Sequence, residues 1–393
     1  MDGGSNTVVV IGAGPAGVAS ALALKDAGMR PLLIDRADKI GSAWRDRRYD
    51  RLKLNTAGPL SHLPGRRYPK GTPVFPSRDQ VIEHLERHAQ EDGIDLLLET
   101  CVEAIDRNDD GWLLWTSAGK LQTGQLIIAT GYENEPVIPE WRGRSDFDGE
   151  LLHSSEYRNP EPYRGRRVLV VGSGNSGMEI AHDLAEGGAS DVRLAVRTPP
   201  NIMPREGTAA ELLAALLYLL PLRVGDAVTR FGRRMNVGDL SEHGLPVPEE
   251  GVFSRLRRLG AVPAILAEEV IESIKQGRFT VVAAVESLDA TGVQLADGER
   301  LEPDAVICAT GYRCGLEPLV GRLGVLDEVG VPKALGGRSA APGLRFIGYV
   351  PRPAGMYYFG KEAKRAAKAI KRELRATRAT RPQLATASAS SHS

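Results

Sequence analysis

Two stretches of the chain share one pattern, an apolar run that leads directly into closely spaced glycines and then into a helix-forming segment. The first is TVVVIGAGPAGVASALAL at residues 7–24, with Gly12, Gly14 and Gly17. An apolar run without alternation is typical of a strand buried on both faces of a parallel sheet. Gly12 permits a tight turn, Gly14 lets the backbone approach a pyrophosphate, and Gly17 lets the helix pack closely on the strand. The pattern predicts a dinucleotide-binding βαβ unit.

The residues after this fingerprint support the same prediction. The helix N-terminus offers free N–H groups and a positive dipole end to phosphate. A second apolar stretch, RPLLID, ends at Asp35, about 20 residues beyond the glycines, where a carboxylate can accept hydrogen bonds from ribose hydroxyls. The alternative is an ordinary glycine-rich turn. The combination of strand, glycines, helix, strand and acid favours the nucleotide site.

The second occurrence is RVLVVGSGNSGMEIAHDLA at residues 167–185, where Gly172, Gly174 and Gly177 repeat the spacing. The strand that follows, VRLAV, ends at Arg197 and Thr198 instead of at an acid. An arginine can bind a 2′-phosphate through two hydrogen bonds, whereas an acid would repel it. The second site is therefore predicted to prefer NADP(H) over NAD(H).

Two alternatives remain for the charges near this second site. Arg197 is also explained as a solvated charge at a strand end, although it occupies the position that distinguishes the two dinucleotides. Arg205 is a weaker candidate for a phosphate contact.

Two dinucleotide sites in one chain indicate electron transfer between two cofactors, and FAD with NADPH is the natural pair. The segments LIIATGY at 126–132 and AVICATGY at 305–312 are near-repeats that we expect to carry the chain between two domains. Their small residues let the backbone pass close to its neighbours. After LRFIGYV at 344–350, the start of a basic amphipathic helix is expected to face the flavin and stabilise its reduced form.

The predicted fold class is α/β, with two dinucleotide-binding, Rossmann-like domains and an NADP domain inserted into a discontinuous FAD domain. The FAD domain is expected at 1–160 and 301–375. The NADP domain is expected at 161–300, with a substrate-covering segment at about 206–255. The cut points are placed near 158–165 and 288–303. A polar tail at 376–393 is expected to be disordered.

Composition excludes several function classes. The 393 residues include 50 Lys and Arg and 50 Asp and Glu, so the formal net charge is zero and nothing points to a nucleic-acid partner. The N-terminus runs straight into an apolar strand without a basic region before it, so no signal peptide is expected. Three cysteines without a CxxC pair fit reduced thiols in a cytoplasm. The oligomeric state is left open, a homodimer included.

The longest apolar run, AAELLAALLYLLPLRV at 209–224, is interrupted by Glu211 and Pro221 and falls short of a membrane span. We expect a buried or pocket-covering helix. A membrane-surface helix is the alternative, because Arg230, Arg233 and Arg234 follow.

The histidines show no metal-ligand spacing, and no metal is expected. His84 and His88 stand four residues apart in VIEHLERHA, beside charged neighbours, so a solvated helix face is predicted.

Four motifs together resemble the flavin-containing monooxygenase family. They are GAGPAG, GSAW at 41–44, FDGELLHSSEY at 147–157, and GSGNSG. The third matches the family's FxGxxxHxxx(Y/F) motif in full. The segments YDRLKLNT, FPSRDQVIEHLERHA, GSGNSGMEIAHDLA and MPRE resemble the YUCCA-type branch and its bacterial relatives. The resemblance covers residues 7 to about 373. Related Baeyer–Villiger enzymes end the third motif with tryptophan, whereas this chain has Tyr157.

The resemblance implies a reaction that uses NADPH and O₂. NADPH would reduce FAD, and oxygen would then give a C4a-(hydro)peroxyflavin protected by bound NADP⁺. This species would oxygenate a soft nitrogen or sulfur centre, or decarboxylate a 2-oxo acid such as an indole-3-pyruvate-like acid. No catalytic triad is expected, because the cofactor carries the chemistry and the protein supplies position and dryness.

The resemblance also implies roles for individual residues. Asn55 in KLNTAGP is the candidate catalytic residue, beside flavin and nicotinamide; an Asx-turn residue is the alternative. Trp44 and Arg45 are expected to wall the isoalloxazine, and Tyr132 and Tyr312 to approach the flavin or the domain hinge.

The FDGELLHSSEY motif is predicted to position the NADP domain. Phe147 and Tyr157 are expected to anchor it by packing, and Gly149 to permit a turn where a side chain would clash. His153 is predicted to hold the linker through a hydrogen bond to a backbone carbonyl, and not to act as an acid or base.

The candidate cofactor-binding residues fall into two groups. For FAD they are Gly12, Gly14, Pro15, Ala16, Gly17, Asp35, Arg36, Trp44, Arg45, Thr130, Gly131 and Gly348. For NADPH they are Gly172, Ser173, Gly174, Asn175, Ser176, Gly177, Arg197 and Thr198. Thr310 and Gly311 of the second ATG segment, in the return part of the FAD domain, are further cofactor-binding candidates.

Two other function classes share these cofactor motifs. One is an NADPH-dependent flavin reductase or uncoupled NADPH oxidase without an oxygenation substrate. A thioredoxin-reductase-like version needs a CxxC, and Cys308 and Cys314 are too far apart for that, so structural thiols are predicted. The other is a non-catalytic flavin-binding sensor.

Overall fold

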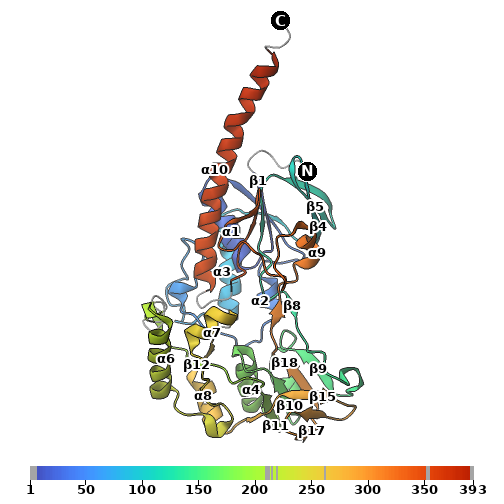
Figure 1. Ribbon diagram of the computed structural model, residues 1–393, viewed down its shortest axis with the longest axis vertical. Coiled ribbons are helices and arrows are strands. Elements are labelled where there is room, and N and C mark those ends of the chain that lie inside the picture. The colour runs from blue at the N-terminus through green and yellow to red at the C-terminus, as the bar shows by residue number, and fades with distance from the viewer. Residues whose placement is uncertain are drawn as a thin grey trace.

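Two units joined by a narrow waist make up the protein (Figure 1). The computed structural model describes residues 7–208, 213, 216–217, 220–260, 263–350 and 355–389. Each unit is built around its own mostly parallel sheet. The predicted fold class, a mixed α/β fold with two dinucleotide-binding units, is confirmed.

The first unit contains a six-stranded sheet. In spatial order its strands are β20 (Ser339–Ala341), β21 (Leu344–Phe346), β7 (Leu126–Ile128), β1 (Thr7–Ile11), β2 (Arg30–Ile34) and β3 (Asp95–Leu97). All neighbours are parallel except β20 and β21. Val8 and Val10 of β1 face one buried core, and Val9 and Ile11 face another. This two-sided burial explains why β1 is apolar without alternation.

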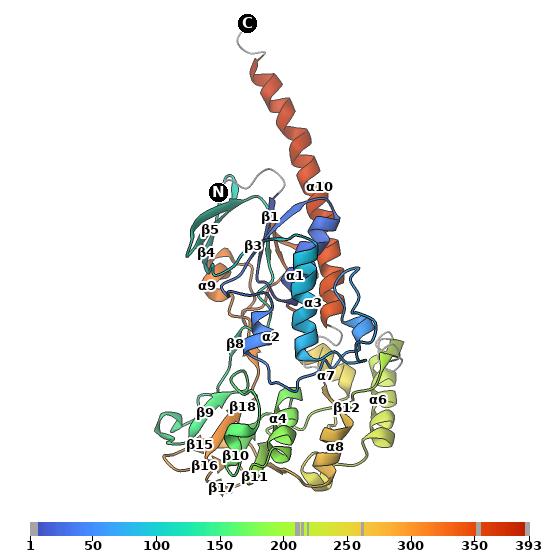
Figure 2. The same ribbon diagram turned by 180° about the vertical axis from the view of Figure 1, so that it is seen from behind.

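Helices cover one face of this sheet and a small antiparallel sheet covers the other. Figure 2 shows α1 (Pro15–Asp26) and α3 (Arg78–Glu91) beside α10 (Gly355–Ala389). The other face packs on the meander β4 (Val102–Asn108), β5 (Gly111–Thr116) and β6 (Gly119–Thr123), and on α9 (Glu317–Val320). The short α2 (Ser42–Asp46) lies near α3.

The second unit contains a five-stranded parallel sheet. Its strands, in spatial order, are β14 (Thr280–Val282), β11 (Asp191–Ala195), β10 (Arg167–Val171), β18 (Ala305–Cys308) and β9 (Glu150–His153). One face packs on α4 (Asn175–Glu186) and α8 (Glu268–Lys275). The other packs on β15 (Val285–Leu288), β16 (Val293–Leu295) and β17 (Arg300–Leu301).

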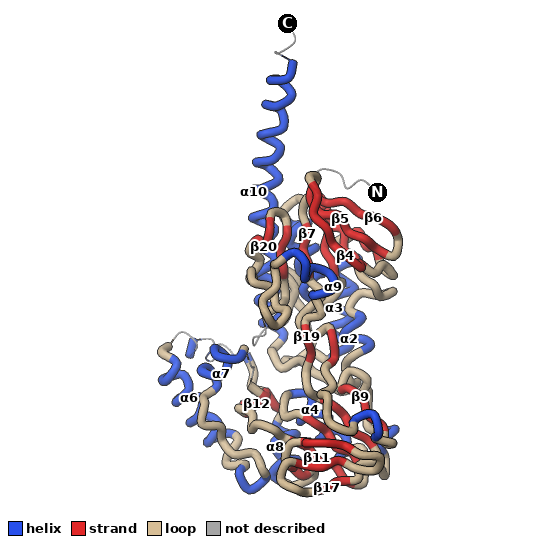
Figure 3. Tube along the Cα trace, turned by 45° about the vertical axis from the view of Figure 1, so that its right-hand side comes forward, coloured by secondary structure: helices blue, strands red, loops and turns tan. Residues whose placement is uncertain are grey.

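The described residues between 202 and 266, which follow β11, pack along one side of this second unit. They include β12 (Ile202–Pro204) paired with β13 (Ala264–Leu266), and the helices α6 (Leu222–Asn236) and α7 (Val252–Leu259). Figure 3 shows α6 at the outer rim. Half of the apolar run predicted as a covering helix at 209–224 lies outside the described residues. Within the described ranges, no helix combines the length and apolar composition needed to cross a bilayer.

The two units join through a two-stranded ribbon, which changes the predicted cut points. β8 (Glu135–Pro136) pairs antiparallel with β19 (Tyr312–Arg313) where the chain crosses in each direction. The sequence placed these crossings near 158–165 and 288–303. They lie elsewhere because β9 and β18 pair with each other inside the second sheet. Such long-range pairing leaves no local signal in the sequence.

Helix α10 also differs from the sequence prediction. It continues to Ala389 and so includes residues 376–389 of the tail that composition predicted to be disordered, while 390–393 lie outside the described residues.

His84 corrects a second prediction, because it is buried and does not lie on a solvated helix face. Its side chain is 2% exposed, and its ring stacks on Tyr68 with centroids 4.1 Å apart. The backbone N–H of Leu63 donates to its Nε2 at 3.3 Å. Burial, with His88 and Arg87 nearby, lowers the pKa of His84 to about 3. Among the described residues, no group of three ligating side chains forms a metal site.

The buried His84 predicts a loss of stability on mild acidification. Because its folded pKa lies below the ordinary value near 6.5, the unfolded chain binds the extra proton as pH falls from about 6.5 towards 3. His84 should contribute a loss of about 1.4 kcal/mol of unfolding free energy per pH unit in that window. Urea denaturation at pH 7, 6 and 5 measures this slope. His84→Gln should reduce this slope, although His88, His153 and His182, whose pKa values burial also lowers, keep contributing to it. His243→Gln, in the 3-10 helix Ser241–His243, should leave it unchanged, and equal slopes in both variants would contradict the assignment.

Candidate active site

The first glycine fingerprint forms a turn between β1 and α1 that admits no other residue at two positions. Gly12 has φ of +102°, and a Cβ there would lie 2.7 Å from the Ala129 carbonyl oxygen. A Cβ on Gly17 would lie 1.7 Å from the Gly12 oxygen. These two glycines are required by the packing of strand, turn and helix against each other.

Gly14 has no such packing reason. A Cβ added there would meet no protein atom within 4 Å, although Gly14 sits at the N-terminus of α1. No side chain caps this helix end. The open space beside Gly14 and the uncapped N–H groups together fit a diphosphate approaching the backbone.

Asp35 ties the end of β2 to the same turn. One carboxylate oxygen accepts from the Ala13 N–H at 2.6 Å, and the other accepts from the Ala37 N–H at 2.9 Å. Each oxygen keeps a further lone pair, so these bonds leave room for ribose hydroxyls. The neighbouring Arg36 reaches away and donates to the Asn134 side-chain oxygen at 3.2 Å.

The second fingerprint repeats this geometry between β10 and α4. Gly172 has φ of +116°, and its Cβ would lie 2.4 Å from the Ala309 carbonyl oxygen. A Cβ on Gly177 would lie 1.8 Å from the Gly172 oxygen. Gly174 again has no protein atom within 4 Å of a Cβ and begins a helix without a side-chain cap. The residues of the second turn therefore fit a second diphosphate.

Side chains beside the second turn already have structural partners. The Asn175 side-chain oxygen accepts from the Ile265 N–H at 2.6 Å, and the Ser173 hydroxyl donates to the Thr198 carbonyl at 3.3 Å. Ser176 lies on the first turn of α4 and is half-buried. In this turn the groups left to bind a phosphate are therefore the backbone N–H groups at the N-terminus of α4.

Arg197 follows β11 at the surface with an unpaired guanidinium. Its side chain is exposed, and it makes no hydrogen bond or ion pair within the described part of the chain. The adjacent Thr198 is also exposed. A free arginine at this strand end can bind a ligand phosphate without breaking an existing contact.

The two ATG segments explain why both fingerprints need their first glycine. The carbonyls of Ala129 and Ala309 press on Gly12 and Gly172 respectively. Thr130, the residue after Ala129, already has a partner within the protein, because its hydroxyl is hydrogen-bonded to the Tyr349 hydroxyl at 2.7 Å.

The second ATG segment and the return strand are held in similar ways. The Thr310 hydroxyl donates to the Val137 carbonyl. Gly131 and Gly311 have φ of +84° and +86°, which lets the chain turn into the ribbon of β8 and β19. Gly348 packs against α1, since a Cβ added there would lie 2.6 Å from the Cβ of Ala16, the residue after Pro15.

His153 bonds the second sheet to the ribbon, as the sequence predicted. The Ser155 N–H donates to Nδ1 at 3.1 Å, so Nε2 carries the proton and donates to the Gly311 carbonyl at 3.1 Å. Its ring contacts that of Tyr312, with centroids 4.8 Å apart. Burial lowers the pKa of His153, which keeps it neutral. The predicted hydrogen-bonding role is confirmed.

The other residues of this motif also have their predicted packing roles. A Cβ on Gly149 would lie 2.4 Å from the Phe147 ring. Phe147 packs against a core of the second unit. Tyr157 is 1% exposed and donates from its hydroxyl to Asp183 of α4 at 2.7 Å.

Asn55 lies where the first unit meets the second, in a network that the sequence did not predict. Its side-chain oxygen accepts from Nη1 of Arg205, the residue directly after β12, at 3.5 Å. Arg205 is buried, lies over the Phe75 ring at 5.3 Å, and approaches Glu179 of α4 at 3.7 Å. Tyr49 donates from its hydroxyl to Glu179 at 2.7 Å, and burial raises the pKa of Glu179. Sequence separations of up to 150 residues hide these contacts from local patterns.

Trp44 and Arg45, the residues predicted to wall the isoalloxazine, lie on α2. Arg45 forms an ion pair with Glu86 of α3 at 2.6 Å, which directs its guanidinium to that helix. Trp44 is partly buried against the first core. Arg48 instead lies between the Trp44 and Tyr312 rings, 5.9 and 5.7 Å from their centroids, and was not predicted.

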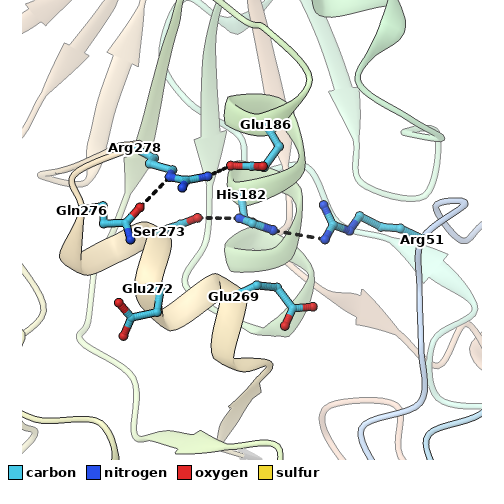
Figure 4. Close-up of a pocket in the computed structure, with 8 residues that line it drawn as sticks. All are labelled: Arg51, His182, Glu186, Glu269, Glu272, Ser273, Gln276 and Arg278. Atoms are coloured by element: carbon cyan, nitrogen blue, oxygen red, sulfur yellow. Dashed lines mark hydrogen bonds and ion pairs between the residues drawn. The ribbon is translucent and has the colours of Figure 1, made fainter. Parts of the chain in front are cut away.

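A cavity of about 330 Å³ opens on the second unit, away from the predicted cofactor residues (Figure 4). Its lining residues are Arg51, His182, Glu186, Glu269, Glu272, Ser273, Gln276 and Arg278. Arg51 of the first unit donates to His182 at 3.1 Å and pairs with Asp183 at 3.0 Å. The cavity is therefore bordered by a contact between the two units.

Comparisons with known proteins agree with this architecture. The family model described as pyridine nucleotide-disulphide oxidoreductase matches residues 9–207. Probable indole-3-pyruvate monooxygenase YUCCA9 of Arabidopsis thaliana is 35% identical over 340 residues, 84% of this chain and 80% of the relative. Indole-3-pyruvate monooxygenase YUCCA1 of Oryza sativa subsp. japonica is 33% identical over 356 residues, covering 88% and 86%.

A solved structure has the same fold. The flavin-containing monooxygenase from Stenotrophomonas maltophilia superposes with a TM-score of 0.70 at 23% identity, covering 96% of this chain and 99% of that one.

Two neighbouring glycines of the second fingerprint should respond differently to alanine. Gly174→Ala should weaken NADPH binding about tenfold or more, about 1.4 kcal/mol, with little change in stability, because its methyl group enters space that we assign to phosphate. Gly177→Ala should destabilise the protein by about 3 kcal/mol, because its methyl group meets backbone. Nucleotide titration and urea denaturation separate the two effects. Full NADPH affinity in Gly174→Ala would exclude a phosphate at this turn.

Proposed function

The chain belongs to the flavin monooxygenases, in their YUCCA-type branch, and from that premise we propose that it uses FAD, NADPH and O₂ to oxygenate a small carboxylate substrate. The substrate class follows from relatives whose names specify indole-3-pyruvate. A 2-oxo acid of this kind would be decarboxylated. Soft nitrogen and sulfur centres are the second substrate class.

One observation carries this proposal: both glycine turns lie close to the same ribbon. Gly12 contacts Ala129, six residues before β8 begins, and Gly172 contacts Ala309, three residues before β19 begins. At about 3.5 Å per residue, the first turn lies within roughly 20 Å of β8, and the second turn lies within roughly 10 Å of β19. The carboxyl edges of both sheets, where ligands bind in such folds, therefore open toward the waist.

The first turn is the proposed FAD site. Gly14 and the end of α1 would hold the diphosphate, with Asp35 at a ribose. When bound, the flavin accepts hydride from NADPH and activates oxygen. The described residues contribute position: Gly348 holds the return strand against α1, and Trp44 with Arg48 stands near the ribbon.

The second turn is the proposed NADPH site. Gly174 and the end of α4 would hold its diphosphate, and Arg197 its 2′-phosphate. His153 fixes the second sheet to the ribbon through Gly311, which determines how a nicotinamide bound to this unit is presented to the first.

Asn55 and Arg205 are the proposed substrate-side groups. They lie together at the junction of the units, and Arg205 is buried with its nearest carboxylate oxygen 3.7 Å away. Arg205 pairs with Glu179 at 3.7 Å and with Glu269 at 4.0 Å, both at the long end of the ion-pair range, so its guanidinium remains available for a closer contact through two hydrogen bonds with a carboxylate ligand. This supports a carboxylate substrate.

A cytoplasmic location also stays a prediction.

The alternative is a reductase or an uncoupled NADPH oxidase. Cys308 and Cys314 are both buried, and burial raises the pKa of these thiols to about 12 and about 11. Such thiols are poor nucleophiles at neutral pH, which disfavours a disulfide reductase and agrees with the structural role predicted for them. An uncoupled oxidase shares every proposed cofactor contact, so only product analysis separates it.

Oxygen accounting tests the proposed function. The purified protein is mixed with NADPH in air, with and without indole-3-pyruvate or a thioether, and NADPH loss is compared with hydrogen peroxide release. Indole-3-pyruvate should lower the peroxide formed per NADPH by at least about half. Stoichiometric peroxide with every substrate would identify an uncoupled oxidase.

The proposed 2′-phosphate contact predicts a change in coenzyme preference. Arg197→Ala should weaken NADPH about 10- to 100-fold, since a charged hydrogen bond contributes about 1.5–3 kcal/mol, and leave NADH nearly unchanged. The matched control is Arg193→Ala, whose guanidinium pairs with Asp191 at 2.9 Å. Equal weakening of both coenzymes by Arg197→Ala would show that the arginine does not bind the 2′-phosphate.

A further inference from the structure

Helix α6 exposes a row of large apolar side chains that no described element covers. Val224, Val228, Phe231 and Met235 are 46%, 42%, 68% and 69% exposed. Their spacing of four, three and four residues places them on one face of the helix. Leu220, just before the helix, is 45% exposed. Single exposed apolar residues are ordinary, but a continuous stripe of this length marks an interaction surface.

A row of arginines runs beside this apolar stripe. Arg223, Arg230 and Arg234 are exposed, and their spacing of seven and four residues places them along one edge of the stripe. Arg230 donates to the Glu249 carbonyl at 2.8 Å. Among the described residues, Arg223 and Arg234 make no hydrogen bond or ion pair. Arg233, which the sequence also suggested for this surface, is buried on the opposite side.

The opposite face of α6 is anchored to the second unit. Asp226, the helix's acidic residue, is 8% exposed and accepts from the Phe253 N–H at the start of α7 at 2.7 Å. A Cβ on Gly225 would lie 2.7 Å from the Phe253 ring, so the two helices are in close contact. Because Asp226 faces inward, the exposed surface of α6 presents positive charge only. Figure 3 shows α6 at the rim of the molecule.

We propose that α6 docks onto the surface of an anionic phospholipid membrane. The apolar stripe would enter the boundary between headgroups and acyl chains, and the arginines beside it would contact anionic headgroups. A second copy of this chain suits the surface less well, because its α6 offers no exposed carboxylate to these arginines. This inference does not depend on the proposed catalytic function.

Vesicle binding tests the electrostatic part. The full-length protein is sedimented with vesicles of phosphatidylcholine alone, or of phosphatidylcholine with phosphatidylglycerol, at low and at physiological salt. Binding should require phosphatidylglycerol and weaken with salt. Arg223→Gln/Arg234→Gln should lower the partition coefficient about 25-fold, from roughly fivefold for each arginine. The control Arg107→Gln/Lys120→Gln removes two charges from the β4–β6 meander at the other end of the molecule (Figure 1) and should bind normally.

The apolar stripe is tested by Phe231→Ser/Met235→Ser, which should lower binding to anionic vesicles at least about tenfold, since both side chains lose most of their transfer free energy. Flavin content and melting temperature show that each variant is folded. No sedimentation of the unmodified protein with anionic vesicles would overturn the proposal, as would equal binding to neutral vesicles. A dimer seen by light scattering that Phe231→Ser/Met235→Ser dissociates, without vesicle binding, would assign the stripe to a second copy.

Discussion

The close approach of a backbone carbonyl to a glycine, made once in each unit, is the constraint on which the rest of the structure depends. The Ala129 carbonyl packs on Gly12 and the Ala309 carbonyl packs on Gly172, where any side chain would collide. Each contact joins the middle of a parallel sheet to the segment that leaves for the other unit. The nucleotide turn and the crossing of the chain are therefore held side by side in both units.

Directional bonds between the units build on this arrangement. His153 reaches from the second sheet to the Gly311 carbonyl, and Tyr49 of the first unit donates to the buried Glu179 of α4. A buried acid is costly unless it is hydrogen-bonded, so the Tyr49 contact favours one docking of the units over neighbouring ones. Asn55 and Arg205 lie in the same network, which couples the proposed substrate groups to the way the two units meet.

Most of the fold could be predicted from the sequence, because each fingerprint is a local pattern whose spacing has a steric cause. The limits came from contacts between distant segments. β9 belongs to the second sheet through its pairing with β18, about 155 residues later, and no local pattern records that pairing. His84 is buried because Tyr68 stacks on it from a preceding loop. The salt bridge between Arg45 and Glu86 of α3 is another contact that no local pattern records, and the expected place of Arg45 beside the cofactor remains a prediction. The proposed contacts of Asn55 and Arg197 rest on position and remain predictions.

Isotope labelling of the product tests most directly whether the two turns act together in oxygenation. The protein is supplied with NADPH, indole-3-pyruvate and ¹⁸O₂, and the product is analysed by mass spectrometry. The account predicts a decarboxylated acid that carries one ¹⁸O atom for each NADPH consumed. A product without ¹⁸O, or NADPH consumption matched entirely by labelled hydrogen peroxide, would contradict it.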